Sequence, residues 1–142
     1  MKNKIIGIFA IIVIIVSLTV GCIGDMGGTT TEEENEVKVD SEIVELAFSS
    51  IDFIKDNDEI VRVEVSYRFK NIAGKDIDFK VYAEFYDIDN NLIFDSSDSP
   101  KEFSLPDGYT EIGIGPANKI GYSGTNLKKV DHVVIKAIEI EN

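Results

Sequence analysis

The stretch VRVEVSYRFK, residues 61–70, decides the fold class of this 142-residue chain. Its valine and aromatic side chains alternate one for one with arginine, glutamate, serine and lysine. This is the period-two pattern of a β-strand that has one apolar face and one polar face. The sequence therefore predicts a strand here, with the apolar side chains turned toward a core.

A second stretch, IDFKVYAEFY at residues 77–86, repeats the pattern, and residues 71–76 form the expected turn between the two. Residues after Gly24 show no convincing helical periodicity. About seven strands in roughly 100 residues predict an all-β, antiparallel, immunoglobulin-like sandwich over residues 37–142. The remaining strands are expected at residues 43–49, 92–95, 109–114, 119–122 and 132–140, between clusters of Asp, Asn, Ser, Gly and Pro.

The N-terminus has the order of a secretory signal. Lys2 and Lys4 precede the uncharged run from Ile5 to Val20, and the small residue Gly21 follows. Residues 1–21 are therefore expected to form a hydrophobic signal helix, and an uncleaved membrane-spanning anchor is the alternative, since the uncharged run is long enough. In both cases the positive residues stay inside and the rest of the chain lies on the extracytoplasmic side.

The end of this run, Leu18-Thr19-Val20-Gly21-Cys22, resembles the lipobox of prokaryotic lipoproteins. The resemblance implies cleavage after Gly21, lipidation of Cys22 and attachment to the cell membrane. Cys22 is the only cysteine, so it forms no disulfide within the chain. Residues 22–36, rich in Gly, Thr and acidic residues, are then a flexible acidic linker between the lipid and the sandwich.

The charge of the chain excludes one class of partner. All 26 acidic residues and 12 of the 14 basic residues lie from Cys22 onward, which leaves a net charge of about −14 there. Such a surface repels phosphate backbones, so we expect no nucleic-acid partner. An extracytoplasmic protein or glycan of unknown identity remains as the expected partner.

Three short segments resemble the FxLYD family of immunoglobulin-like domains found in exported prokaryotic proteins. They are Phe69-Lys70-Asn71 with Gly74, the run AEFYD at residues 83–87, in which Tyr86 and Asp87 match literally, and LPDGYT at residues 105–110. The resemblance covers roughly residues 42–142. It implies a noncatalytic surface module and supplies no catalytic residues.

A set of oxygen-bearing side chains follows the second long strand at the spacing of a calcium loop. Leu92 stands where the sharp turn of an EF-hand requires glycine, so a plain hairpin turn is the alternative. With calcium, the domain would be a calcium-stabilised surface module. Without it, no cofactor is expected. The candidate ligands are Asp87, Asp89, Asn91, Asp95 and Asp98.

Three aromatic residues are candidates for a binding surface. Tyr82 and Tyr86 lie two residues apart on the polar face of their strand and suit contact with sugar or protein, or ordinary packing within a sheet. Phe103 lies in the polar connection of residues 95–107, which suits either a binding loop or an irregular edge strand.

The side chains needed for common catalytic sites are scarce. His132 is the only histidine, and its neighbour Asp131 is expected to point to the opposite face of a strand, which argues against a Ser-His-Asp triad. A carboxylate-dependent hydrolase remains as the alternative from another class, although no spacing singles out a pair. We therefore expect a protein that is not an enzyme.

Overall fold

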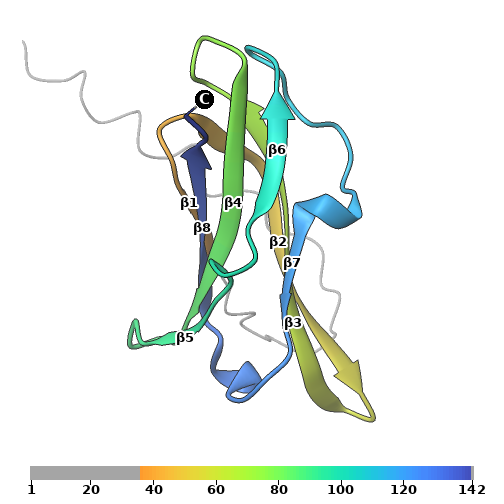
Figure 1. Ribbon diagram of the computed structural model, residues 1–142. Coiled ribbons are helices and arrows are strands. Elements are labelled where there is room, and N and C mark those ends of the chain that lie inside the picture. The colour runs from red at the N-terminus through yellow and green to blue at the C-terminus, as the bar shows by residue number, and fades with distance from the viewer. Residues whose placement is uncertain (1–35, 142) are drawn as a thin grey trace, which may run out of the picture. The chain divides into compact units, whose positions relative to one another are not determined.

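Eight strands and two three-residue 3-10 helices make up residues 36–141, the part of the chain that the computed structural model describes (Figure 1). The predicted signal helix, its cleavage after Gly21, Cys22 and almost all of the predicted linker lie outside these residues. The strands are β1 (Glu36–Asp40), β2 (Val44–Asp56), β3 (Glu59–Asn71), β4 (Ile77–Tyr86), β5 (Leu92–Asp95), β6 (Lys101–Leu105), β7 (Lys119–Tyr122) and β8 (His132–Glu139), and the 3-10 helices are η1 (Pro116–Asn118) and η2 (Leu127–Lys129).

The strands form two sheets that face each other. The five-stranded sheet has the order β1-β8-β4-β5, and β6 pairs with the N-terminal half of β4 on the same side as β5. The three-stranded sheet has the order β2-β3-β7. The chain crosses from one sheet to the other four times, between β1 and β2, between β3 and β4, between β6 and β7, and between β7 and β8, so the core is closed by segments far apart in sequence.

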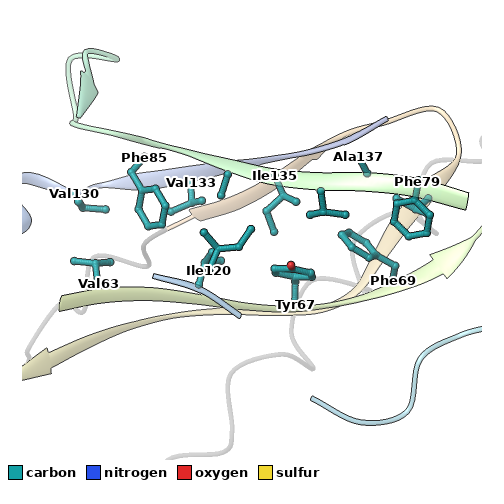
Figure 2. Packing of buried hydrophobic residues seen from close by; sticks show 14 of the residues in the cluster. Val63, Tyr67, Phe69, Phe79, Phe85, Ile120, Val130, Val133, Ile135 and Ala137 are labelled. Atoms are coloured by element: carbon teal, nitrogen blue, oxygen red, sulfur yellow. The ribbon is translucent and has the colours of Figure 1, made fainter. Parts of the chain in front are cut away.

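The core lies between the two sheets and is filled by the apolar positions of the period-two pattern (Figure 2). From Val63 onward on β3, and along all of β4, every second side chain is almost completely buried, as the alternation predicts. The prediction is wrong for Val61, which is 44% exposed beside the β2–β3 hairpin end. Burial of these side chains is the main favourable contribution to folding. The largest fully buried groups include Tyr67, Phe69, Phe79, Phe85 and Ile135.

The hairpin between β2 and β3 has a two-residue turn at Asn57 and Asp58. Both residues have positive φ angles, 48° and 65°. Type I′ hairpin turns require such angles, and Asn and Asp tolerate them better than other non-glycine residues. The turn explains why β2 and β3 pair along most of their lengths, from Val44 with Asn71 to Asp56 with Glu59.

The prediction of a wholly antiparallel sandwich of about seven strands is wrong in one respect. β1 pairs with β8 in parallel, from Glu36 opposite His132 to Asp40 opposite Lys136. The chain can place β1 there because it crosses to the other sheet immediately afterwards, through residues 41–43, and so needs no hairpin. The domain is therefore an all-β sandwich with one mixed sheet.

The predicted strand at residues 109–114 is also wrong. Only one isolated bridge forms there, between Thr110 and Lys70. Beyond it the Glu111 carboxylate, instead of a backbone carbonyl, accepts the hydrogen bond of the Phe69 N–H at 2.8 Å. Gly113, Gly115 and Pro116 weaken any continuation of a strand. Conversely, the polar connection after residue 95 contains the regular edge strand β6.

Asn71 is a buried polar residue that ties the β3–β4 turn to the end of β6. Its side-chain amide donates to the carbonyl oxygens of Lys75, Leu105 and Pro106 at 2.8, 3.0 and 3.0 Å. Its Oδ1 accepts a hydrogen bond from the Ala73 N–H at 2.9 Å. The residue is 1% exposed, so these contacts replace water for every polar atom of the amide.

Tyr67 couples the stability of the sandwich to alkaline pH. Its hydroxyl donates to the carbonyl oxygen of Ala117 at 3.0 Å, and burial, with a smaller contribution from Glu111, raises its pKa well above the usual value. Above about pH 10 the unfolded tyrosine loses its proton while the folded one keeps it, so stability falls as pH rises. We expect Tyr67→Phe to lose about 1 kcal/mol at pH 7 and to flatten this alkaline decline in urea denaturation series.

Tyr109→Phe is the matched control, because Tyr109 is 46% exposed. It should leave both the neutral stability and the alkaline decline nearly unchanged. Parallel pH curves for the wild-type protein and Tyr67→Phe would show that Tyr67 does not carry the coupling.

Candidate binding surface

The outer face of the five-stranded sheet is the surface on which the predicted tyrosines lie. Because alternate side chains of β4 point away from the core, Tyr82 and Tyr86 are both on this face and both partly exposed. Within residues 36–141 the only helices are the two three-residue 3-10 helices, so no helical layer covers the sheet. Its side chains on β4 and β8 are Asp78, Lys80, Tyr82, Glu84 and Tyr86, and His132, Val134, Lys136 and Ile138.

Tyr82 lies in a shallow groove of about 660 Å³ on this face. The groove runs over β4, between the C-terminal end of β8 and the connection from β5 to β6. Ile138, which is 54% exposed, and Ile140 line one side, and Pro100 lines the other. Lys80 continues the groove into a second hollow of about 380 Å³ beside β6. We call these two hollows together the outer groove.

The larger hollow of the outer groove is mainly apolar, whereas the smaller hollow is mainly polar. Asp78, Glu102 and Glu141 contribute carboxylates to its lining, and Glu139 is neutralised by Lys75 at 2.6 Å. Lys80 is the one lysine that lines it among the described residues, and its Nζ lies 4.0 Å from Glu102. The outer groove therefore combines exposed aliphatic surface with a net negative charge.

Tyr86 lies on the same face but outside the outer groove, and it is held in a polar network. Its ring stacks on His132 with centroids 5.3 Å apart and planes 8° apart, and its hydroxyl donates to Glu84 Oε2 at 2.7 Å. That hydrogen bond raises the pKa of the Tyr86 hydroxyl. Lys136 Nζ lies 3.8 Å from Glu84 and donates to Asp40 at 2.6 Å, which raises the pKa of Lys136. Tyr86 thus helps to hold β1, β8 and β4 together.

Phe103 faces the other way. Its ring stacks on Phe79 with centroids 5.5 Å apart and also meets Phe69 and Tyr67 edge-on. These three rings belong to the core, so Phe103 closes the sandwich at the β6 edge. Only a part of it lines the smaller hollow of the outer groove. We therefore place Phe103 with the packing residues.

The expectation that Asp131 cannot reach His132 is wrong. Asp131 Oδ2 lies 2.9 Å from His132 Nδ1. The two side chains can meet because β8 begins at His132, so Asp131 belongs to the preceding turn and does not follow the alternation of the strand. The His132 ring packs on Tyr86, and among the described residues none of the hydrogen bonds of His132 involves a serine.

The five candidate calcium ligands form two separate turns. Asp87 Oδ1 accepts hydrogen bonds from the backbone N–H groups of Asp89 and Asn91, and the Asn91 side chain also donates to it. Asp95 accepts hydrogen bonds from the backbone and the hydroxyl of Ser97. No group of three or more His, Cys, Asp or Glu side chains in residues 36–141 is placed to hold a metal ion.

Asp87 closes the turn between β4 and β5 as a charged acceptor, and its hydrogen bonds from Asn91 hold its pKa below the usual value. A depressed pKa means that the ionised form stabilises the fold above about pH 4 and that this stabilisation is lost as pH falls through the folded-state pKa. We expect Asp87→Ala to lower the melting temperature at pH 7, and the difference from wild type to shrink below pH 4. Thermal unfolding followed by circular dichroism measures both.

Asp98→Ala is the control for the neighbouring turn and should leave the melting temperature unchanged. We expect millimolar calcium to shift none of the three proteins. A calcium-dependent rise in melting temperature that both substitutions abolish would instead show that the turns bind the ion.

The aliphatic side of the outer groove was missed by sequence reasoning, although one signal points to it. In HVVIKAIEI, residues 132–140, the inward positions are apolar, but the outward positions Val134, Ile138 and Ile140 are apolar too. A strand that faces water is expected to carry polar residues there. Pro100 gave no comparable signal, because its place beside β4 depends on the pairing of β5 and β6.

Among residues 36–141, no helix is long and apolar enough to cross a membrane. No family model and no curated protein matches the sequence. Among solved structures, the chain is similar to a DUF1425 family member from Shewanella sp. pv-4, with 13% identity and a TM-score of 0.44 over 70% of this chain and 80% of that one. It is also similar to Campylobacter jejuni cj0090, with 13% identity and a TM-score of 0.41 over 72% of this chain and 98% of that one. Neither similarity transfers a function to this chain.

Proposed function

We propose that this protein is a lipid-anchored, extracytoplasmic binding module that performs no chemistry of its own. The observation that carries the proposal is the outer groove, where Tyr82, Ile138, Ile140 and Pro100 present apolar surface to solvent on an uncovered sheet. Exposed apolar surface with a polar rim is typical of sites that bind a partner. The partner contact therefore lies on β4 and β8.

The anchor is proposed from the sequence of the leader. The run from Leu18 to Cys22 supports cleavage after Gly21 and acylation of the cysteine, and the linker that follows supplies reach. Two or more acyl chains give stable membrane attachment, whereas one chain gives only marginal attachment. We also propose an immunoglobulin-like class for the sandwich, supported by its three-stranded sheet β2-β3-β7 facing the pair β4-β8.

Intact-mass measurement of the protein purified from membranes tests the anchor. The expected mass is that of a chain beginning at Cys22 with acyl groups added. A chain of unmodified mass that begins at Met1 would overturn the lipoprotein proposal.

Photo-crosslinking on intact cells tests the binding face. A photoreactive amino acid replaces Ile138 in one variant and Ile54 in the other, where Ile54 is a comparably exposed isoleucine on β2 of the opposite sheet. We expect a discrete crosslinked adduct from position 138 and none from position 54. Equal labelling at both positions, or none at either, would contradict a partner contact on the outer groove.

A further inference from the structure

We infer that the outer groove binds an extended segment of another protein that carries apolar side chains together with lysine or arginine. The inference rests on the proposed binding function and names the chemistry of the partner. Three properties of the groove lead to it, namely its shape, its lining and its charge.

The shape of the outer groove favours a chain over a compact ligand. Small-molecule sites usually enclose most of the surface of their ligand, about 70–90%. The outer groove instead lies open on the face of a sheet, and its two adjoining hollows, which share Lys80 and Ile140 in their linings, follow one another as a track over β4. An extended peptide can lie along such a track and bury one edge of itself. A small ligand in the same place would keep much of its surface in water.

The lining favours apolar side chains over sugar. Ile138, Ile140 and Pro100 provide no hydrogen-bonding side chain, and Tyr82 is the only aromatic residue of the larger hollow. Sugar hydroxyls pressed against this aliphatic part of the lining would lose water without gaining partners, which is unfavourable. Aliphatic side chains of an extended segment, which point to one side at every second residue, would gain by leaving water there.

The charge favours a basic segment. Three carboxylates line the outer groove, those of Asp78, Glu102 and Glu141. Among the described residues, no lysine nitrogen lies closer than 4.0 Å to any of them. Only Lys80 opposes them from within the lining. The net charge of about −14 from Cys22 onward adds a field that attracts cations and repels acidic partners. Lysine or arginine residues between the apolar positions of the partner would face these carboxylates.

Three labelled octapeptides test the inference against the full-length protein in phosphatidylcholine nanodiscs, with empty nanodiscs as the blank. The peptides are (Lys-Leu)₄, (Lys-Ser)₄ and (Glu-Leu)₄, and binding is followed by fluorescence anisotropy. We expect (Lys-Leu)₄ to bind most tightly, to weaken as salt is raised, and to lose at least tenfold in affinity with Ile138→Ser. Ile54→Ser, at a similarly exposed position, should bind as the wild-type protein does.

A triple variant, Asp78→Asn combined with Glu102→Gln and Glu141→Gln, removes the charges of the three carboxylates. It should weaken the binding of (Lys-Leu)₄ and leave the melting temperature close to that of wild type. Equal binding of (Lys-Ser)₄, an equal loss with Ile54→Ser, or no binding of (Lys-Leu)₄ would overturn the inference. The crosslinking experiment separates this failure from that of the proposed function. An adduct at position 138 with a partner that lacks basic residues leaves the binding module standing and removes only the basic segment.

Discussion

Replacement of Phe69 by alanine is expected to lower the free energy of unfolding by about 3–5 kcal/mol, the range for truncating a buried phenylalanine. Phe69 is completely buried at the centre of the aromatic cluster that joins the two sheets. Its ring centroid lies 5.0 Å from that of Tyr67, 5.7 Å from that of Phe79 and 6.1 Å from that of Phe103. The substitution would leave a cavity that rigid strands on both sides cannot fill.

Urea denaturation measures this loss, and Phe48→Ala is the matched control. Phe48 also lies in the three-stranded sheet but is only half-buried, with its ring under the Arg68 guanidinium at 5.0 Å. We expect about 1 kcal/mol for that control, since exposed cation–π contacts and partial burial contribute little. Since small domains have only about 5–15 kcal/mol of stability, the Phe69 variant should lose a large fraction of its stability. Equal costs at the two positions would argue against an aromatic core centred on Phe69.

Replacement of Asn71 by leucine is expected to cost about 2–4 kcal/mol, although the two side chains are similar in size. The leucine would leave the carbonyl oxygens of Lys75, Leu105 and Pro106 and the N–H of Ala73 without their partner. Unsatisfied buried polar groups each cost about 1–3 kcal/mol, although partial access of water to the turns reduces the sum. The loss should appear as a lower urea midpoint with an unchanged slope.

Asn71→Asp separates hydrogen bonding from packing. It keeps the volume and the acceptor oxygen, but it points a second oxygen at three carbonyl groups and places a charge in a site that is 1% exposed. We expect a larger loss than for leucine at pH 7 and a partial recovery near pH 4, where protonation restores a donor and removes the charge. An aspartate variant as stable as wild type at pH 7 would contradict the role given to the amide.

The sequence predicted the parts of the fold that depend on local alternation. β3, β4, β5, β7 and β8 lie where the apolar and polar residues alternate or where turn residues bound a short apolar run. β1 could not be placed in the sheet from sequence, because EVKVD has the same alternation whichever neighbour it has. Its parallel pairing depends on an edge of β8 that only the folded core provides. Residues 109–114 also alternate in part, but strand pairing stops at Glu111. Its backbone N–H donates to the Phe69 carbonyl oxygen, whereas its side chain, not its own carbonyl, accepts the hydrogen bond from the Phe69 N–H.

The candidate site was predictable only for Tyr82. Its outward direction follows from the strand pattern of β4 alone. Ile138 lies across from Lys80 through the pairing of β8 with β4, and Pro100 reaches the same groove through the connection between β5 and β6. These residues come from three parts of the chain, and no short-range spacing relates them. Asn71 was visible as part of a family resemblance, but its role as a shared donor depends on carbonyl groups more than 30 residues away.

The parallel strand β1 has a mechanical consequence for an anchored protein. In the proposed arrangement, tension between the membrane and a bound partner enters the sandwich at Glu36 and leaves through β8 near Ile138. Because Glu36 lies opposite His132 and both strands run in the same direction, these opposite pulls slide β1 along β8. This shear geometry loads the hydrogen bonds of all five register pairs at the same time. When two strands are peeled apart from one end, the hydrogen bonds break one after another. The short strand at the entrance of the domain would thus resist force far better than its length suggests.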